Sequence, residues 1–198
     1  QNWGLKFGVP NAVGAQTVFP QITGNQEQRI GLDSGVTIGI MTFDSEFDNY
    51  FFESNDAPAP FNFSSDSSSS TINVIAGTHT IATPVFINSP LTISNSTSNP
   101  FTINNGISGE NLITIQSGLI IFDHSDIGVT ITSSTYTGKV IIDSGTNTPT
   151  LRLSSIDSLP ESNPFQVDGT LELVFQDGTQ NIASLDGAGT IDLGITTH

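Results

Sequence analysis

The chain has 198 residues, of which only 12% are charged, about half the share that is usual in globular proteins. Four basic residues stand against 19 acidic ones, and the net charge of −15 disfavours nucleic acid and anionic membranes as partners, because both require clustered Lys and Arg. The absence of cysteine excludes a disulfide framework, and no apolar run approaches the roughly 20 residues that span a bilayer.

Residues 1–70 form a first section that does not follow the regular repeat of the remaining chain. It contains Trp3, a segment at Gly35–Phe43 with the alternating pattern of a half-buried strand, and most of the phenylalanines. We interpret it as an atypical start that covers the first turn, because an open end would expose apolar side chains and strand edges. An aromatic ligand platform is the alternative. Ser64–Ser70 is predicted to be a polar loop or linker.

From residue 71 onward, short apolar-x-apolar motifs recur about every 20 residues. One series begins at Ile72, Leu91, Ile113, Val129, Leu151, Leu171 and Ile191. A second series runs between them and begins at Ile81, Phe101, Ile120, Val140, Phe165 and Ile182. Such pairs are typical of strands with one buried face, and the fixed period is typical of a chain that winds one turn per repeat. We therefore expect each series to align into one continuous ladder.

These repeats favour an all-β fold, a parallel β-helix with about 20 residues per coil, over a two-sheet sandwich of short strands, which is the competing interpretation. We divide the chain into an N-terminal capping section, 1–70, with its aromatic cluster and Ser-rich loop, and regular β-helix coils, 71–198. Residues 155–164 contain two prolines and are predicted to lengthen one turn.

The coils resemble the passenger region of bacterial autotransporters. The matching segments are 35–43, 72–85, 107–113, 134–138 and 180–194. The last segment is the most similar, because it follows the Ser-Leu-x-Gly-x-Gly-x-x-x-Leu-Gly pattern of passenger β-helices. The resemblance implies a right-handed parallel β-helix exposed outside a Gram-negative cell. Such passengers are most often adhesins or structural surface proteins and less often enzymes or toxins.

A glycan-active enzyme is one functional alternative, and hydrolysis would need two carboxylates that face a sugar roughly 5–9.5 Å apart. Asp123 and Asp126, with His124 between them, are the best local candidates, and Asp143 follows one expected coil later. A polar turn after an apolar run explains the same residues without catalysis. Lyase chemistry is disfavoured, because the coils carry only two basic residues. We predict no catalytic residue and no cofactor.

Asp44, Glu46 and Asp48 are the only candidates for a metal site that the sequence offers. Three carboxylates at alternate positions offer the hard oxygen ligands that Ca²⁺ prefers. The glycine-rich repeat of calcium-binding β-rolls is absent, and a solvated loop explains the same spacing.

The sequence ends four residues after the strand-like segment Ile191–Gly194, with nothing that resembles a cover. Since an uncovered coil is a polymerising edge, we expect either that the protein continues or that another copy stacks there. The sequence therefore favours a non-catalytic structural or adhesive protein, extracellular or on a bacterial surface, that self-associates end to end. Its expected partners are copies of itself and host or environmental surfaces, with no membrane insertion. An excised passenger fragment of a large autotransporter adhesin is the second functional hypothesis.

Overall fold

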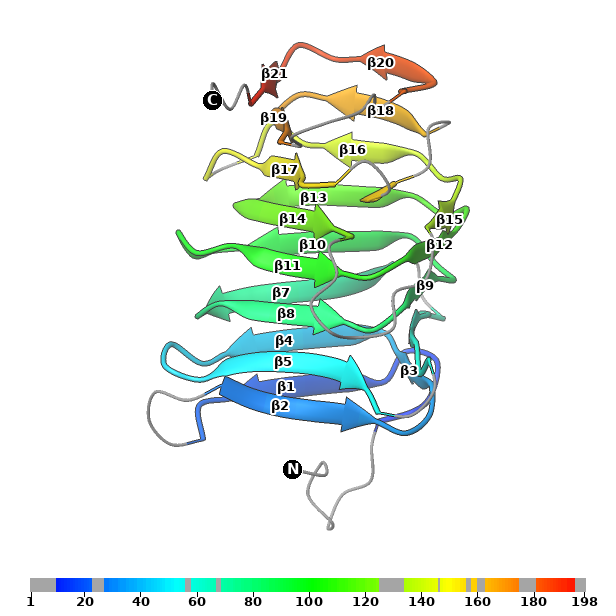
Figure 1. Cartoon of the computed structure of the whole chain (residues 1–198), viewed down its shortest axis with the longest axis vertical. Helices are drawn as coiled ribbons and strands as arrows, with labels where there is room; N and C mark the ends of the chain where they lie inside the picture. Colours follow the sequence, from blue (N-terminus) through cyan, green and yellow to red (C-terminus); the bar gives the residue numbers. More distant parts are fainter. Residues whose placement is uncertain are drawn as a thin grey trace.

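The computed structural model is a rod of stacked turns built from three parallel β-sheets, with β1 and β21 at opposite ends of the rod (Figure 1). The structure describes residues 10–22, 27–55, 58–66, 69–124, 134–145, 147–155, 158–159, 163–174 and 181–194. The secondary structure of these ranges consists almost entirely of β-strands. The arrangement confirms the predicted parallel β-helix and excludes the sandwich, whose sheets would contain antiparallel pairs.

Two sheets, A and B, contain eight strands each, and sheet C contains five. Sheet A comprises Gln16–Pro20 (β1), Ile40–Asp44 (β4), Ser70–Ala76 (β7), Leu91–Asn95 (β10), Ile113–Ser117 (β13), Val140–Ile142 (β16), Pro164–Val167 (β18) and Ser184–Asp186 (β20). Sheet B comprises Glu27–Leu32 (β2), Asn49–Ser54 (β5), His79–Ala82 (β8), Phe101–Asn104 (β11), Leu119–Asp123 (β14), Thr150–Leu153 (β17), Thr170–Leu173 (β19) and Thr190–Leu193 (β21). Sheet C comprises Val36–Ile38 (β3), Phe61–Phe63 (β6), Val85–Ile87 (β9), Ile107–Gly109 (β12) and Thr135–Tyr136 (β15).

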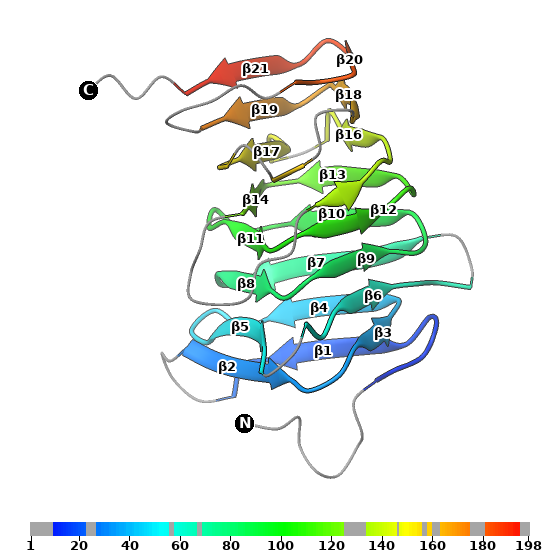
Figure 2. The same ribbon diagram turned by 45° about the vertical axis from the view of Figure 1, so that its right-hand side comes forward.

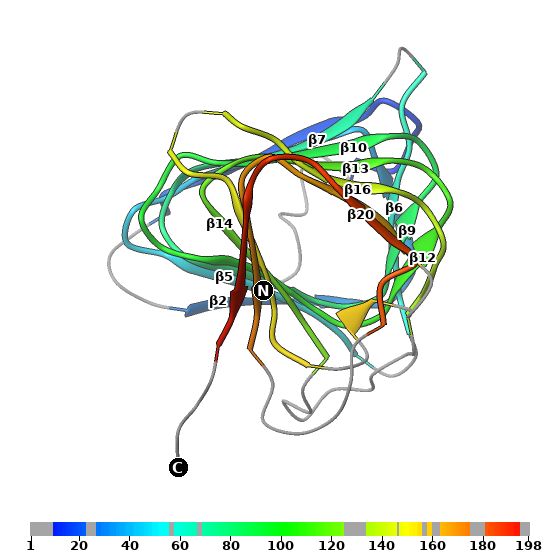
Figure 3. The ribbon, with the colours of Figure 1, turned by 90° about the horizontal axis from the view of Figure 1, so that it is seen from above.

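The chain passes through the sheets in the order A, B, C in each of the first five turns, and the later described strands alternate between sheets A and B. The rod has about seven turns with about 22 residues per turn. Figure 1 shows sheet B in front running to the right and sheet A behind running to the left while the chain rises, so the winding is right-handed. This is the hand that crossovers between parallel strands almost always take. Figure 2 brings the strands of sheet C into view, and Figure 3 looks down the axis onto the three sides.

Alternate side chains of the strands point into the rod, and those on the coils before β20 and β21 form one continuous apolar core. In sheet B a single inward ladder runs through all eight strands without a register shift. Its members are Ile30, Phe52, Ile81, Ile103, Phe122, Leu153, Leu173 and Leu193. Neighbouring coils therefore bury one another's apolar side chains, and no single coil has a core of its own.

The two apolar series predicted from the sequence exchange sheets in the middle of the rod. Ile72, Leu91 and Ile113 lie in sheet A, but Leu151, Leu171 and Ile191 lie in sheet B. Ile113 pairs with Val140, and Ile120 pairs with Leu151, because a long connection separates β14 from β15. The prediction of one ladder per series was therefore wrong. A fixed spacing of about 20 residues assigns the motifs after this long turn to sheet A when they lie in sheet B, and the reverse. The Val129 motif falls outside the described residues.

The first section of the chain already contributes strands to all three sheets. Strands β1 to β6 precede residue 70 and supply the first two strands of each sheet. The described part of the Ser-rich segment is bonded to the adjacent coils: Ser64 N–H donates to Ile38 O, and the hydroxyls of Ser70 and Ser89 are 2.8 Å apart. Coverage of the first turn by this section stays a prediction.

Most of the described aromatic residues of the first section lie inside the rod and pack against one another, whereas Phe47 is exposed and Phe51 faces outward beneath Arg29. Phe43 has no exposed surface and lies with its ring centroid 5.1 Å from that of Phe19 and 4.5 Å from that of His79. Phe52 packs edge-on against Phe61 with their ring centroids 5.3 Å apart. These rings form the core of the first coils and not a ligand platform on the surface.

A buried asparagine shows how the corners are built. Asn95 ends β10, and its amide donates hydrogen bonds to the carbonyls of Asn99, at 2.7 Å, and Leu119, at 3.1 Å, while its side-chain oxygen accepts from Thr97 N–H. Gly118 lies on the next coil with φ of +69°, and a Cβ there would lie 2.2 Å from the Asn95 carbonyl oxygen. The side chain therefore satisfies backbone groups that the turn leaves unpaired inside the rod.

Candidate functional site

The predicted calcium ligands do not converge. Asp44 and Glu46 are exposed, whereas Asp48 is fully buried. One oxygen of the Asp48 carboxylate accepts from Ile22 N–H at 2.8 Å and from the Ser45 hydroxyl at 3.3 Å. Across the described ranges, no group of three or more His, Asp or Glu side chains could hold a metal ion. Asp48 therefore serves the corner between β4 and β5, and its neighbours face solvent.

The candidate catalytic carboxylates lie at different corners of the rod. Asp123 ends β14 in sheet B, whereas Asp143 follows β16 in sheet A. Each accepts a hydrogen bond from the next backbone N–H, of His124 at 2.8 Å and of Ser144 at 2.7 Å, which is ordinary turn chemistry. Asp126 falls outside the described residues. The expectation that Asp143 lies one coil above Asp123 was wrong, because that coil is longer than the average turn.

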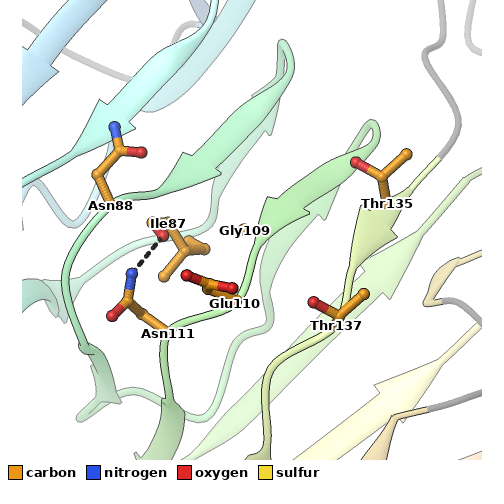
Figure 4. Close-up of a pocket in the computed structure, with 7 residues that line it drawn as sticks. All are labelled: Ile87, Asn88, Gly109, Glu110, Asn111, Thr135 and Thr137. Carbon is orange, nitrogen blue, oxygen red and sulfur yellow. Dashed lines mark hydrogen bonds between the residues drawn. The ribbon is translucent and has the colours of Figure 1, made fainter.

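A shallow polar hollow of about 460 Å³ lies on the outer face of sheet C. Its lining residues come from three neighbouring coils, as Figure 4 shows, and are Ile87, Asn88, Gly109, Glu110, Asn111, Thr135 and Thr137. The Asn111 amide donates a hydrogen bond to the Ile87 carbonyl oxygen at 3.0 Å, and the Thr135 hydroxyl donates one to the Ser108 hydroxyl at 2.8 Å. One carboxylate and a few hydroxyl and amide groups can hydrogen-bond a polar ligand. The lining contains no paired nucleophile and base.

No sequence motif indicates this hollow, because its residues are ordinary turn and strand residues whose proximity depends on the register of sheet C. Ser108 pairs with Thr135 across the long connection, and Ile87 pairs with Gly109. A prediction that assumes the wrong number of residues for this coil would therefore assign these residues to different sides of the rod.

His79 is a buried titratable group, and its contacts give it a structural role. Its Nε2 lies 2.7 Å from the Ala76 carbonyl oxygen, and its Nδ1 accepts from Tyr50 N–H at 3.1 Å, which fixes the neutral tautomer. Burial lowers the pKa of His79 below its ordinary value. The ring also stacks on Phe43. His79 is therefore part of the core.

The last described coil exposes apolar side chains at positions that earlier coils bury. Leu185, Ile191 and Leu193 are 48%, 40% and 61% exposed. One coil earlier, the ladder partners of the first two, Phe165 and Leu171, are 3% and 0% exposed. Since β20 and β21 are the end strands of sheets A and B, this coil presents an apolar surface together with two strand edges.

The opposite end of the rod has a different character. Strands β1 and β2 are the other end strands of sheets A and B, but their inward side chains Phe19, Ile30 and Leu32 are buried. Their outward side chains include Gln16 and Arg29, both exposed. The two ends therefore differ in apolar exposure and in charge.

The basic side chains in the described part of the chain form ion pairs or hydrogen bonds with side chains of the next coil. Arg152 binds Glu172 one coil above with a 2.6 Å contact. Arg29 contacts Glu27 and Glu53, each at 2.7 Å, and its guanidinium lies 4.4 Å from the centre of the Phe51 ring. With so few cations, the outer surface is dominated by acidic and uncharged polar groups.

Comparison with known proteins finds no family, no curated protein and no solved structure that matches this chain. Among the residues that the structure describes, no helix has the length and apolar character needed to cross a membrane.

Proposed function

We propose that this protein is a non-catalytic extracellular structural or adhesive β-solenoid whose copies stack end to end. The observation that carries this proposal is the exposed apolar surface of the last coil. Inside the rod, equivalent side chains are buried by the next coil. A second copy that places its first coil on β20 and β21 would supply the missing layer and continue both sheets.

The energetics favour coverage of this end. Fully burying a Leu or Ile side chain contributes about 1.5–3 kcal/mol, and three such side chains are roughly half exposed here. Strand edges add unpaired backbone groups that a further parallel strand would satisfy. Joining the ends of two rods therefore gains both apolar burial and hydrogen bonds over one compact interface.

The flanks of the rod suit an adhesive role. Outward-facing threonines align across neighbouring coils, as Thr71, Thr92 and Thr114 do in sheet A and Thr80 and Thr102 do in sheet B. Such regular rows offer many weak hydroxyl contacts to a host or environmental surface. The resemblance to autotransporter passengers supports an extracellular or bacterial surface location. Asp123 and Asp143 lie at different corners, so these two carboxylates do not form the facing pair that a glycan-active enzyme would need.

Sedimentation velocity over a range of protein concentrations tests the proposal. We expect the weight-average sedimentation coefficient to rise with concentration, and electron microscopy of the concentrated sample to show rods of one width and variable length. A monomer at every concentration would contradict end-to-end stacking. The last coil would then be covered in another way, such as by further coils of the same polypeptide in a larger adhesin.

A further inference from the structure

The register of sheet B defines which residues would meet if one rod continued another. Its outward ladder runs through all eight strands and contains Arg29, Phe51, Thr80, Thr102, Ile121, Arg152, Glu172 and Asp192. The inward ladder beside it begins at Ile30 and ends at Leu193. A second rod that continues the inward ladder, with Ile30 on Leu193, therefore places Arg29 on Asp192.

The last three members of the outward ladder are charged and lie on successive coils. Arg152 and Glu172 are ladder partners one coil apart, and they form an ion pair at 2.6 Å. Asp192 is the ladder partner of Glu172 on the last coil, and it is exposed. Like charges that lie directly opposite on adjacent strands are destabilising. The ladder therefore ends on an unfavourable acidic pair that a cation on the next layer would relieve.

Arg29 is the cation that the other end of the rod offers. It lies at the first position of the same outward ladder, and its side chain is 54% exposed. Its contacts with Glu27 and Glu53 hold the guanidinium at the outer face of β2. A guanidinium can bridge several carboxylates, because it carries five N–H donors in a planar fork.

We propose that copies stack head to tail in register, with Arg29 of one copy paired with Asp192 of the copy below. This inference rests on the proposed end-to-end stacking and adds the polarity and the register of the joint. Sheet A gives the same alignment, because its outward ladder begins at Gln16 and ends at Asp186, so that an amide meets a carboxylate.

A tail-to-tail joint is disfavoured by the same charges. It would bring together two copies of an end that carries Asp186 and Asp192 and offers no cation on β20 or β21. It would also join the strands antiparallel, whereas every pair within the rod is parallel. The head-to-tail joint keeps both sheets parallel and pairs opposite charges, as heterologous contacts do in open filaments.

Charge reversal on each side of the joint tests this arrangement. Arg29→Asp alone creates an Asp–Asp joint, and Asp192→Arg alone creates an Arg–Arg joint. We expect each variant alone to require about tenfold more protein for half-maximal assembly at low salt. An equimolar mixture of the two variants restores opposite charges at every alternating joint, so assembly should return close to the wild-type concentration dependence. Lys139→Asp and Glu110→Arg are matched controls, since both residues are exposed and lie on middle coils.

The possible outcomes separate this inference from the proposed function. If the wild type assembles and both charge variants assemble equally well alone, the inferred register is wrong while end-to-end stacking stands. If both variants are impaired and their mixture is no better, the Arg29–Asp192 pairing is also wrong. If the wild type does not assemble at all, the proposed function itself is contradicted. Circular dichroism of each variant establishes that the β-solenoid is retained.

Discussion

Replacing Phe43 with alanine is expected to lower the free energy of unfolding by about 3–5 kcal/mol, the largest effect of any single core substitution that we predict. Phe43 has no exposed surface and lies between residues of several coils. Its ring centroid lies 5.1 Å from that of Phe19 and 5.7 Å from that of Phe101, on strands that precede and follow it along the rod. The cavity therefore weakens the contacts between coils as well as within one coil.

Urea unfolding followed by circular dichroism measures this loss. Phe47→Ala is the matched control, because Phe47 is 47% exposed and close to Phe43 in sequence, and its replacement should change stability by no more than about 0.5 kcal/mol. Equal effects of the two substitutions would mean that the aromatic stack does not form the core of the first coils.

Introducing aspartate at both Ile191 and Leu193 is expected to abolish assembly while leaving the rest of the rod folded. Both side chains are exposed on the last coil, so the isolated rod loses little when they are replaced. In a stack they would be buried under the next copy, and the substitution would place two unpaired carboxylates in that interface. Each buried charge opposes association by several kcal/mol, so the concentration for half-maximal assembly should rise by at least about a hundredfold.

Sedimentation velocity of the double variant is compared with a flank control, Ile75→Asp combined with Phe86→Asp. These two apolar residues are 53% and 38% exposed but lie on middle coils, so they should leave stacking intact. A double variant at 191 and 193 that assembles as the wild type does would show that the last coil is not the joint.

The strands could be predicted from the sequence because their side chains alternate. Motifs such as Leu91-Thr-Ile93 and Leu171-Glu-Leu173 place two apolar side chains on one face, and no other element explains that period as well. The parallel winding followed from the repeat length.

Membership of the ladders could not be predicted, because it depends on the number of residues in every connection. Residues between Asp123 and Thr135 lengthen one coil, and beyond them a fixed spacing assigns Leu151 to sheet A instead of sheet B. The same error placed Asp143 above Asp123. The polar hollow and the alignment of Arg29 with Asp192 both depend on register, so they became visible only once the strand pairs were known.

Disulfide cross-linking between the two ends tests head-to-tail stacking most directly. The natural chain has no cysteine, so Gln16→Cys combined with Asp186→Cys provides the only thiols, at positions that leave Arg29 and Asp192 unchanged. Adjacent strands lie about 4.8 Å apart, within the Cα separation that a disulfide accepts. We predict a ladder of covalent oligomers on mild oxidation, with dimers at most when Asp186→Cys is present alone. The absence of species beyond dimers in the double variant would contradict the stacked rod.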